Sequence, residues 1–147
     1  RALVRSRGLG DVYKRQDETQ TDDSIVADAA SAITFSQDLV ALTGLSDPVT
    51  TSGLTVTAAS SDSSALSTQW QRKTATGLRW VNITSSLDGG VYGNTGAATG
   101  VTSGAATALT ITAGTKAALD GYEYRVKITS AGGAEEVTSA YKSITFA

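Results

Sequence analysis

The chain has 147 residues and a formal net charge of −2, and 40% of its residues are hydrophobic. This length accommodates one ordinary domain with a core, and a composition rich in Thr, Ser, Ala, Gly and Val favours strands and turns over helices. The absence of Cys and His excludes disulfides, zinc sites built from thiolates or imidazoles, and Cys or His nucleophile pairs. No apolar run approaches the roughly 18 residues of a membrane span, so we expect none.

The first sixteen residues, RALVRSRGLGDVYKRQ, carry five of the twelve basic side chains. Their apolar stretch, ALV, is too short for a secretory signal, whereas a basic arm that binds nucleic acid is physically reasonable. Residues 6–16, however, resemble the in-frame translation of a transposon-end adapter used in sequencing libraries. We therefore interpret residues 1–16 as an artefact that takes no part in the fold. Without them, seven basic and thirteen acidic side chains remain, and a nucleic-acid partner is no longer expected.

Residues 17–39 are interpreted as a linker, with or without the last strand of a preceding module. The triplet Ile-Thr-Phe at 33–35 recurs at 144–146, a separation near the ~100 residues of one β-sandwich module plus a linker. We therefore expect a fragment of a longer protein with tandem modules, as assembled environmental reads would yield. The acidic run at 17–23 could bind calcium, but it lacks the spacing of known calcium loops, so a solvated linker is favoured.

From residue 40 onward, short stretches that alternate apolar and polar residues are separated by turn residues. An alternation with a period of two is typical of half-buried strands, and a helical period is indicated only for one turn at 115–120. The stretch 77–84 is predicted to pair with the stretch 66–73 as a hairpin, because a Thr-Ala-Thr-Gly turn separates them. The predicted strands are 53–60, 66–73, 77–84, 108–112, 122–129 and 135–146.

Four positions on these strands form a recognisable pattern. They are Val56 on the predicted strand 53–60, Trp70 on 66–73, and Tyr124 and Val126 on the penultimate strand, 122–129. With the segments TQWQRK, LRWVNI, ALTIT and LDGYEYRVKI, the region 40–147 resembles the cysteine-free immunoglobulin-like modules that occur in tandem in bacterial and phage proteins. The resemblance implies an all-β fold, an immunoglobulin-like antiparallel β-sandwich of about seven strands with Greek-key connections.

The resemblance also implies roles for individual residues. Val56 and Val126 stand where antibody domains have paired cysteines, and Tyr124 is expected to bond the backbone near Leu119 or Asp120 as a tyrosine corner. The predicted structural core consists of Val56, Trp70, Leu109, Ile111, Tyr124 and Val126.

The sequence predicts a non-enzymatic protein, because no nucleophile stands beside a base, and no cofactor or metal ligand is expected. Asp88, in the LDGG segment, and Asp120 are favoured as turn formers. We expect a structural or adhesive module of a bacterial surface protein or phage virion protein, at the cell surface, on the virion or otherwise extracellular. The expected partners are neighbouring modules of the same chain and a host-surface glycan or protein. The alternative is a carbohydrate-binding module attached to an enzyme.

Trp80 and Tyr92 are the candidate ligand contacts, because exposed aromatic rings can stack on sugars. Packing of Trp80 over the edge of the core is the favoured interpretation. The outward positions of the penultimate strand, Glu123, Arg125 and Lys127, offer no aromatic platform, and Trp80 and Tyr92 lie on different segments. We therefore expect no measurable affinity for soluble polysaccharides.

Overall fold

The computed structural model describes residues 30–93 and 96–147, so residues 1–16, interpreted as an adapter translation, and residues 17–29 of the predicted linker 17–39 lie outside the described residues. Ser31–Ala147 forms one compact unit in which strands predominate, and the prediction of an all-β fold is confirmed. In chain order the elements are β1 (Ile33–Gln37), β2 (Leu42–Leu45), β3 (Ser52–Ser60), β4 (Leu66–Lys73), β5 (Val81–Asn82), the 3-10 helix η1 (Leu87–Gly89), β6 (Ala97–Val101), β7 (Ala106–Ile111), α2 (Lys116–Leu119), β8 (Glu123–Ser130), β9 (Val137–Thr138) and β10 (Lys142–Phe146).

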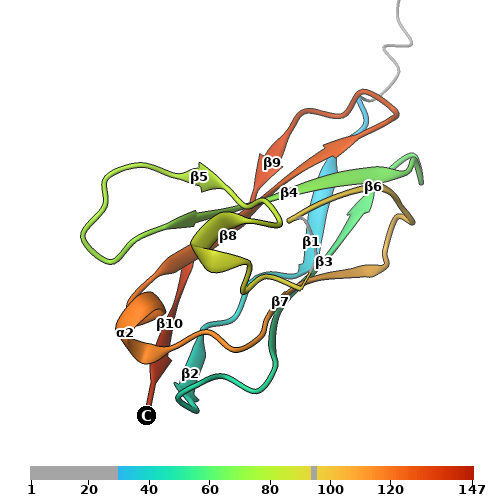
Figure 1. The fold of residues 1–147 in the computed structure, drawn as a ribbon. Helices are drawn as coiled ribbons and strands as arrows, with labels where there is room; N and C mark the ends of the chain where they lie inside the picture. The colour runs from blue at the N-terminus through green and yellow to red at the C-terminus, as the bar shows by residue number, and fades with distance from the viewer. Residues whose placement is uncertain (1–29, 94–95) are drawn as a thin grey trace, which may run out of the picture. The chain divides into compact units, whose positions relative to one another are not determined.

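The strands form two sheets that pack as a sandwich (Figure 1). The smaller sheet has the order β1-β3-β7, and the larger has the order β2-β10-β8-β4-β5, with β6 paired to β4 and β9 paired to β8. The chain changes sheet at each step from β1 to β4, and again from β6 to β7 and from β7 to β8, as in Greek-key connections. The described residues form ten strands instead of about seven, and the pair β2–β10 is parallel, whereas a fully antiparallel sandwich was expected.

Strand β1 belongs to this unit, which differs from the expected start of the module at residue 40. It pairs antiparallel with β3, with Ile33 opposite Ser60 and Phe35 opposite Ala58. Because this pairing buries the Ile33 side chain in the core, residues 33–37 form the first strand of the described unit.

Two predicted strands are shorter than their sequence pattern indicates. Of residues 77–84, only Val81 and Asn82 pair with β4, because Leu78 and its neighbours lie in an exposed loop. The predicted strand 135–146 is divided into β9 and β10 near Ser139. There, the Ser139 hydroxyl accepts a hydrogen bond from the backbone N–H of Val126, so a side chain replaces a backbone partner.

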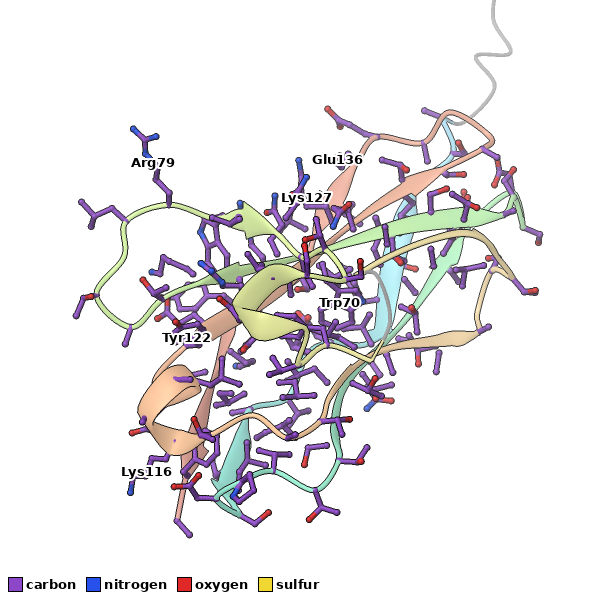
Figure 2. The ribbon with its side chains drawn as sticks, in the orientation of Figure 1. Trp70, Arg79, Lys116, Tyr122, Lys127 and Glu136 are labelled. Carbon is purple, nitrogen blue, oxygen red and sulfur yellow. The ribbon has the colours of Figure 1, made fainter. Side chains whose placement is uncertain are left out.

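The core lies between the two sheets, and all six residues predicted for it are buried. Alternation along the strands turns Val56 of β3 and both Trp70 of β4 and Val126 of β8 inward, and Figure 2 shows Trp70 in the interior. Val56 and Val126 are fully buried, and each such side chain contributes about 1.5–3 kcal/mol of transfer free energy. Apolar burial therefore holds together a fold that contains no disulfide.

Thr68 is a polar residue on the inward face of β4. The residue is 5% exposed, and among the described residues its hydroxyl has no hydrogen-bond partner. Thr68→Val keeps the branched shape and removes the unsatisfied hydroxyl, so we expect the free energy of unfolding to rise by about 1 kcal/mol in urea titrations. Thr129→Val, on an exposed position of β8, should change it by less than about 0.5 kcal/mol. A loss of stability in Thr68→Val would contradict this assignment.

Candidate functional site

The outer face of the larger sheet carries a continuous row of polar side chains. Because Trp70 and Val126 point into the core, the residues next to them on β4 and β8 point outward. Gln71 of β4 lies opposite Arg125 of β8 and opposite Asn82 of β5. Arg125 Nε donates to Gln71 Oε1 at 2.8 Å, and Gln71 Nε2 donates to Asn82 Oδ1 at 2.8 Å. These bonds hold three side chains from three strands in one arrangement.

Two aromatic rings, Trp80 and Tyr141, meet on this outer face. Their centroids are 6.0 Å apart and their planes are inclined by 54°. The Arg125 guanidinium lies 4.3 Å from the Trp80 ring centroid, and Lys73 Nζ lies 5.4 Å from Trp80 and 5.7 Å from Tyr141. Lys73 also forms an ion pair with Glu123. Guanidinium and ammonium groups are attracted to the faces of aromatic rings, so this arrangement positions both rings against the sheet.

The structure separates the two aromatic residues that the sequence singled out. Trp80 is partly buried and lies on the outer face against Arg125, which differs from the expected packing over the core edge. Tyr92 is 4% exposed and belongs to the core, so it is no ligand contact. Tyr141, which sequence reasoning missed, is 60% exposed and is the aromatic neighbour of Trp80. The outer face therefore carries a second aromatic ring beside Trp80, one that the expectation of no aromatic platform did not include.

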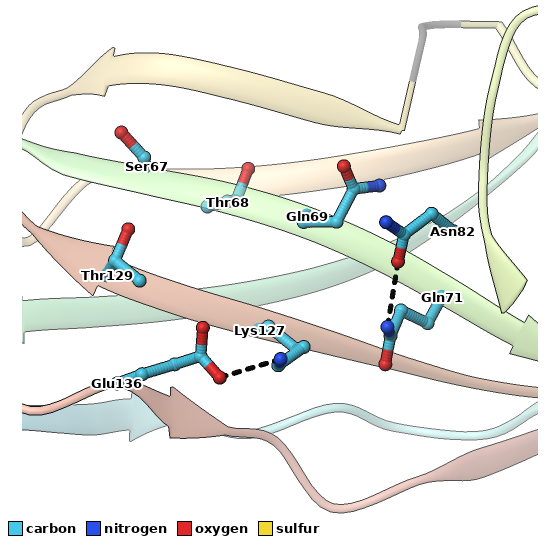
Figure 3. Close-up of a pocket in the computed structure, with 8 residues that line it drawn as sticks. All are labelled: Ser67, Thr68, Gln69, Gln71, Asn82, Lys127, Thr129 and Glu136. Carbon is cyan, nitrogen blue, oxygen red and sulfur yellow. Dashed lines mark hydrogen bonds and ion pairs between the residues drawn. The ribbon is translucent and has the colours of Figure 1, made fainter. Parts of the chain in front are cut away.

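A polar hollow of about 270 Å³ lies along β4, β5 and β8 (Figure 3). It shares Gln71 and Asn82 with the row described above, and Lys127 Nζ pairs with Glu136 Oε1 at 2.7 Å at its margin. Hydroxyl, amide and charged groups therefore line this hollow. Its residues belong to β4, β5, β8 and the segment directly before β9. The lining residues are Ser67, Thr68, Gln69, Gln71, Asn82, Lys127, Thr129 and Glu136.

A second polar cluster lies on the inner side of the sandwich and includes Asp88 of η1. Arg72 donates to Asp88 through Nε at 2.9 Å and Nη2 at 2.7 Å, and the Tyr92 hydroxyl donates to Asp88 Oδ2 at 2.7 Å. The Tyr92 and Tyr124 hydroxyls are 3.2 Å apart, so Tyr124 meets Tyr92 instead of the backbone near Leu119 or Asp120. We call Arg72, Asp88, Tyr92 and Tyr124 the buried network. It ties the loop around η1 to β4 and β8.

The environment of the buried network shifts its acid–base equilibria. Burial, followed by the nearby Tyr124, raises the pKa of Tyr92 well above the ordinary value, and burial likewise raises the pKa of Tyr124. The hydrogen bonds that Arg72 donates to Asp88 raise the pKa of Arg72. Both tyrosines therefore remain protonated in the folded protein at pH values at which an unfolded chain has lost those protons.

This difference predicts that the protein loses stability in alkaline solution. Because the folded-state pKa values of Tyr92 and Tyr124 are raised, their contribution is present in full below about pH 10, the ordinary pKa of tyrosine. It is lost as the pH rises toward the raised values. We expect the free energy of unfolding to fall above about pH 10, and tyrosinate absorbance of these two residues to appear only with unfolding. Tyr92→Phe should weaken the pH dependence, and an unchanged dependence in that variant would contradict the assignment.

Within the described ranges, no cluster of three or more carboxylates is placed to hold a metal ion. The acidic run at 17–23 lies outside those ranges, whereas Asp120 accepts a hydrogen bond from the Phe146 backbone N–H at 3.1 Å. No helix in the described part of the chain is long and apolar enough to cross a membrane. Neither a scan against protein-family models nor a search of curated proteins finds a match to the chain.

Proposed function

We propose that the chain is a non-catalytic immunoglobulin-like module that serves as a structural and adhesive unit of a bacterial surface protein or phage virion protein. The strand order supports the resemblance, since a β1-β3-β7 sheet faces a sheet in which β10, β8 and β4 are neighbours. Trp70 on β4 and Tyr124 on β8, both buried, occupy the positions that this family uses for its core.

The parallel pairing of β2 with β10 is the observation that carries the structural role. Leu42 lies opposite Ile144 and Leu45 lies opposite Phe146, and the Ala147 N–H donates to the Leu45 carbonyl at 3.0 Å. These are the first and last strands of the larger sheet in chain order. Because they are parallel, tension that reaches β2 from its N-terminal side and β10 from its C-terminal side pulls them in opposite directions and loads their hydrogen bonds together in shear. Such an arrangement suits a module that transmits force between its neighbours.

The non-catalytic part of the proposal is supported by how the buried charges are used. Arg72 and Asp88 are largely buried and bonded to each other through both carboxylate oxygens, and the Tyr92 hydroxyl donates a further hydrogen bond to Asp88 Oδ2. Groups of this kind supply proton transfer in active sites only when they can reach a substrate. In the buried network they are engaged in joining a loop to the sheet.

Single-molecule force spectroscopy of the full chain, tethered at both ends, tests the structural role. We expect one force peak that releases the length of residues 31–147, and a lower peak force in Leu45→Ala, which weakens β2. Ile33→Ala removes a similarly buried side chain from β1 and should lower the force less. Extension without a resolved peak, or equal effects of the two substitutions, would overturn the proposal.

A carbohydrate-binding module attached to an enzyme is the second candidate, favoured by the meeting of Trp80 and Tyr141 and by the polar hollow. The parent reading frame distinguishes the two. Further modules of the same kind on either side support the structural unit, whereas an adjoining catalytic domain supports the carbohydrate-binding module.

A further inference from the structure

We propose that the outer face of β5, β4, β8 and the start of β10 binds an uncharged saccharide, with one sugar ring against Trp80 and Tyr141 and its hydroxyls in the polar hollow. This inference rests on the adhesive part of the proposed function and specifies its ligand class and its residues.

The two aromatic rings are inclined to each other, which leaves their faces open to a ligand. With centroids 6.0 Å apart and planes inclined by 54°, Trp80 and Tyr141 do not cover each other's faces. Arg125 and Lys73, the cations against Trp80, both rise from the sheet, so they support the indole ring from the sheet side. Tyr141 is 60% exposed. The C–H face of a sugar ring provides the flat apolar surface that such aromatic rings accept.

The hollow offers hydrogen-bonding groups that are already held in position. Gln71 and Asn82 are fixed by their mutual bond, and Gln71 is fixed further by Arg125. In the described part of the chain, no hydrogen bond engages the hydroxyls of Ser67 and Thr129 or the amide nitrogen of Asn82. Hydroxyls and amides both donate and accept, as the hydroxyls of a sugar do. A volume of about 270 Å³ lies just below the range of about 300–1,000 Å³ for drug-sized ligands, which suits one ring.

The charges on this face favour an uncharged ligand over an anionic one. Lys73 is paired with Glu123, Lys127 with Glu136, and Arg125 is bonded to Gln71 and covered by Trp80. Capture of an anion would require breaking these contacts. Arg79 points away from the body of the unit (Figure 2).

The test titrates the full chain with cellohexaose, chitohexaose, mannohexaose and the anionic hexagalacturonate, followed by tryptophan fluorescence and calorimetry. We expect at least one uncharged hexasaccharide to bind saturably, with an affinity lowered about tenfold by Tyr141→Ala and lost in Trp80→Ala. Leu78→Ala is the control, because this side chain in the loop before Trp80 is 96% exposed and lies outside the proposed site. It should bind like the parent.

Three results would overturn the inference: no binding of any uncharged hexasaccharide, binding that survives both aromatic substitutions, or salt-sensitive binding of hexagalacturonate alone. Salt-sensitive binding of hexagalacturonate alone would indicate that this face binds anions. The force measurement separates this inference from the structural role. If the chain resists force but does not bind sugar, the structural role stands and the saccharide site is rejected. If the chain binds sugar but does not resist force, only the structural role is rejected.

Discussion

Trp70→Ala is expected to lower the free energy of unfolding by about 3–5 kcal/mol, the usual range for removing a large aromatic side chain from a core. Trp70 is 1% exposed between the two sheets; its backbone N–H donates to the Gly96 carbonyl, and its carbonyl accepts a hydrogen bond from the Ile83 N–H. Since native domains have only about 5–15 kcal/mol of stability, and this one has no disulfide, this loss is a large fraction of the total. Urea titration followed by circular dichroism measures the change.

Trp80→Ala is the matched control for this experiment. Trp80 lies on the outer face and packs against Arg125 and Tyr141, so its removal leaves no cavity in the core. Its loss should lower stability by less than about 1.5 kcal/mol, the upper range for ring and cation contacts of this kind. Equal losses in the two variants would show that the assignment of one tryptophan to the core and the other to the surface is wrong.

Asp88→Ala is expected to lower the free energy of unfolding by about 2–4 kcal/mol, because it leaves the Arg72 guanidinium largely buried without its partner. It also removes the acceptor of the Tyr92 hydroxyl, so the loop around η1 loses its connection to β4. Thermal unfolding of the parent and the variant measures this loss.

Glu136→Gln provides the comparison, because it breaks the ion pair with Lys127, in which the Glu136 side chain is 44% exposed. Exposed pairs contribute at most about 1 kcal/mol, so this variant should unfold close to the parent. If Glu136→Gln were as destabilising as Asp88→Ala, the buried network would have no special role in holding the sandwich together.

The sequence pattern predicted the central strands well, because their faces are defined locally. In β3, β4 and β8, inward and outward residues alternate without interruption, so Val56, Trp70 and Tyr124 could be assigned to the core from their own segments. The place of β1 could not be predicted in this way. Its burial depends on pairing with β3, and a five-residue stretch does not identify a partner that follows much later in the chain.

The candidate site was less predictable, because it depends on the register between distant strands. Tyr92 follows a Gly-rich turn and was expected to be exposed, yet its bridge to Ile111 and its contact with Tyr124 place it inside. Tyr141 directly precedes Lys142, which pairs with Tyr124, and its ring meets that of Trp80. The division of the last predicted strand into β9 and β10 could not be seen in the sequence pattern. The pattern of single strands could therefore not show that Trp80 has an aromatic neighbour.

The most direct test of this account exploits the presence of two tryptophans, of which Trp70 belongs to the fold and Trp80 to the proposed binding face. With 5-fluorotryptophan incorporated into the full chain, fluorine NMR should give two signals, which Trp80→Phe assigns. On titration with the uncharged hexasaccharides, the account predicts that the Trp80 signal shifts and saturates while the Trp70 signal stays in place. A Trp80 signal that never moves, or a Trp70 signal that moves with it, would contradict the account.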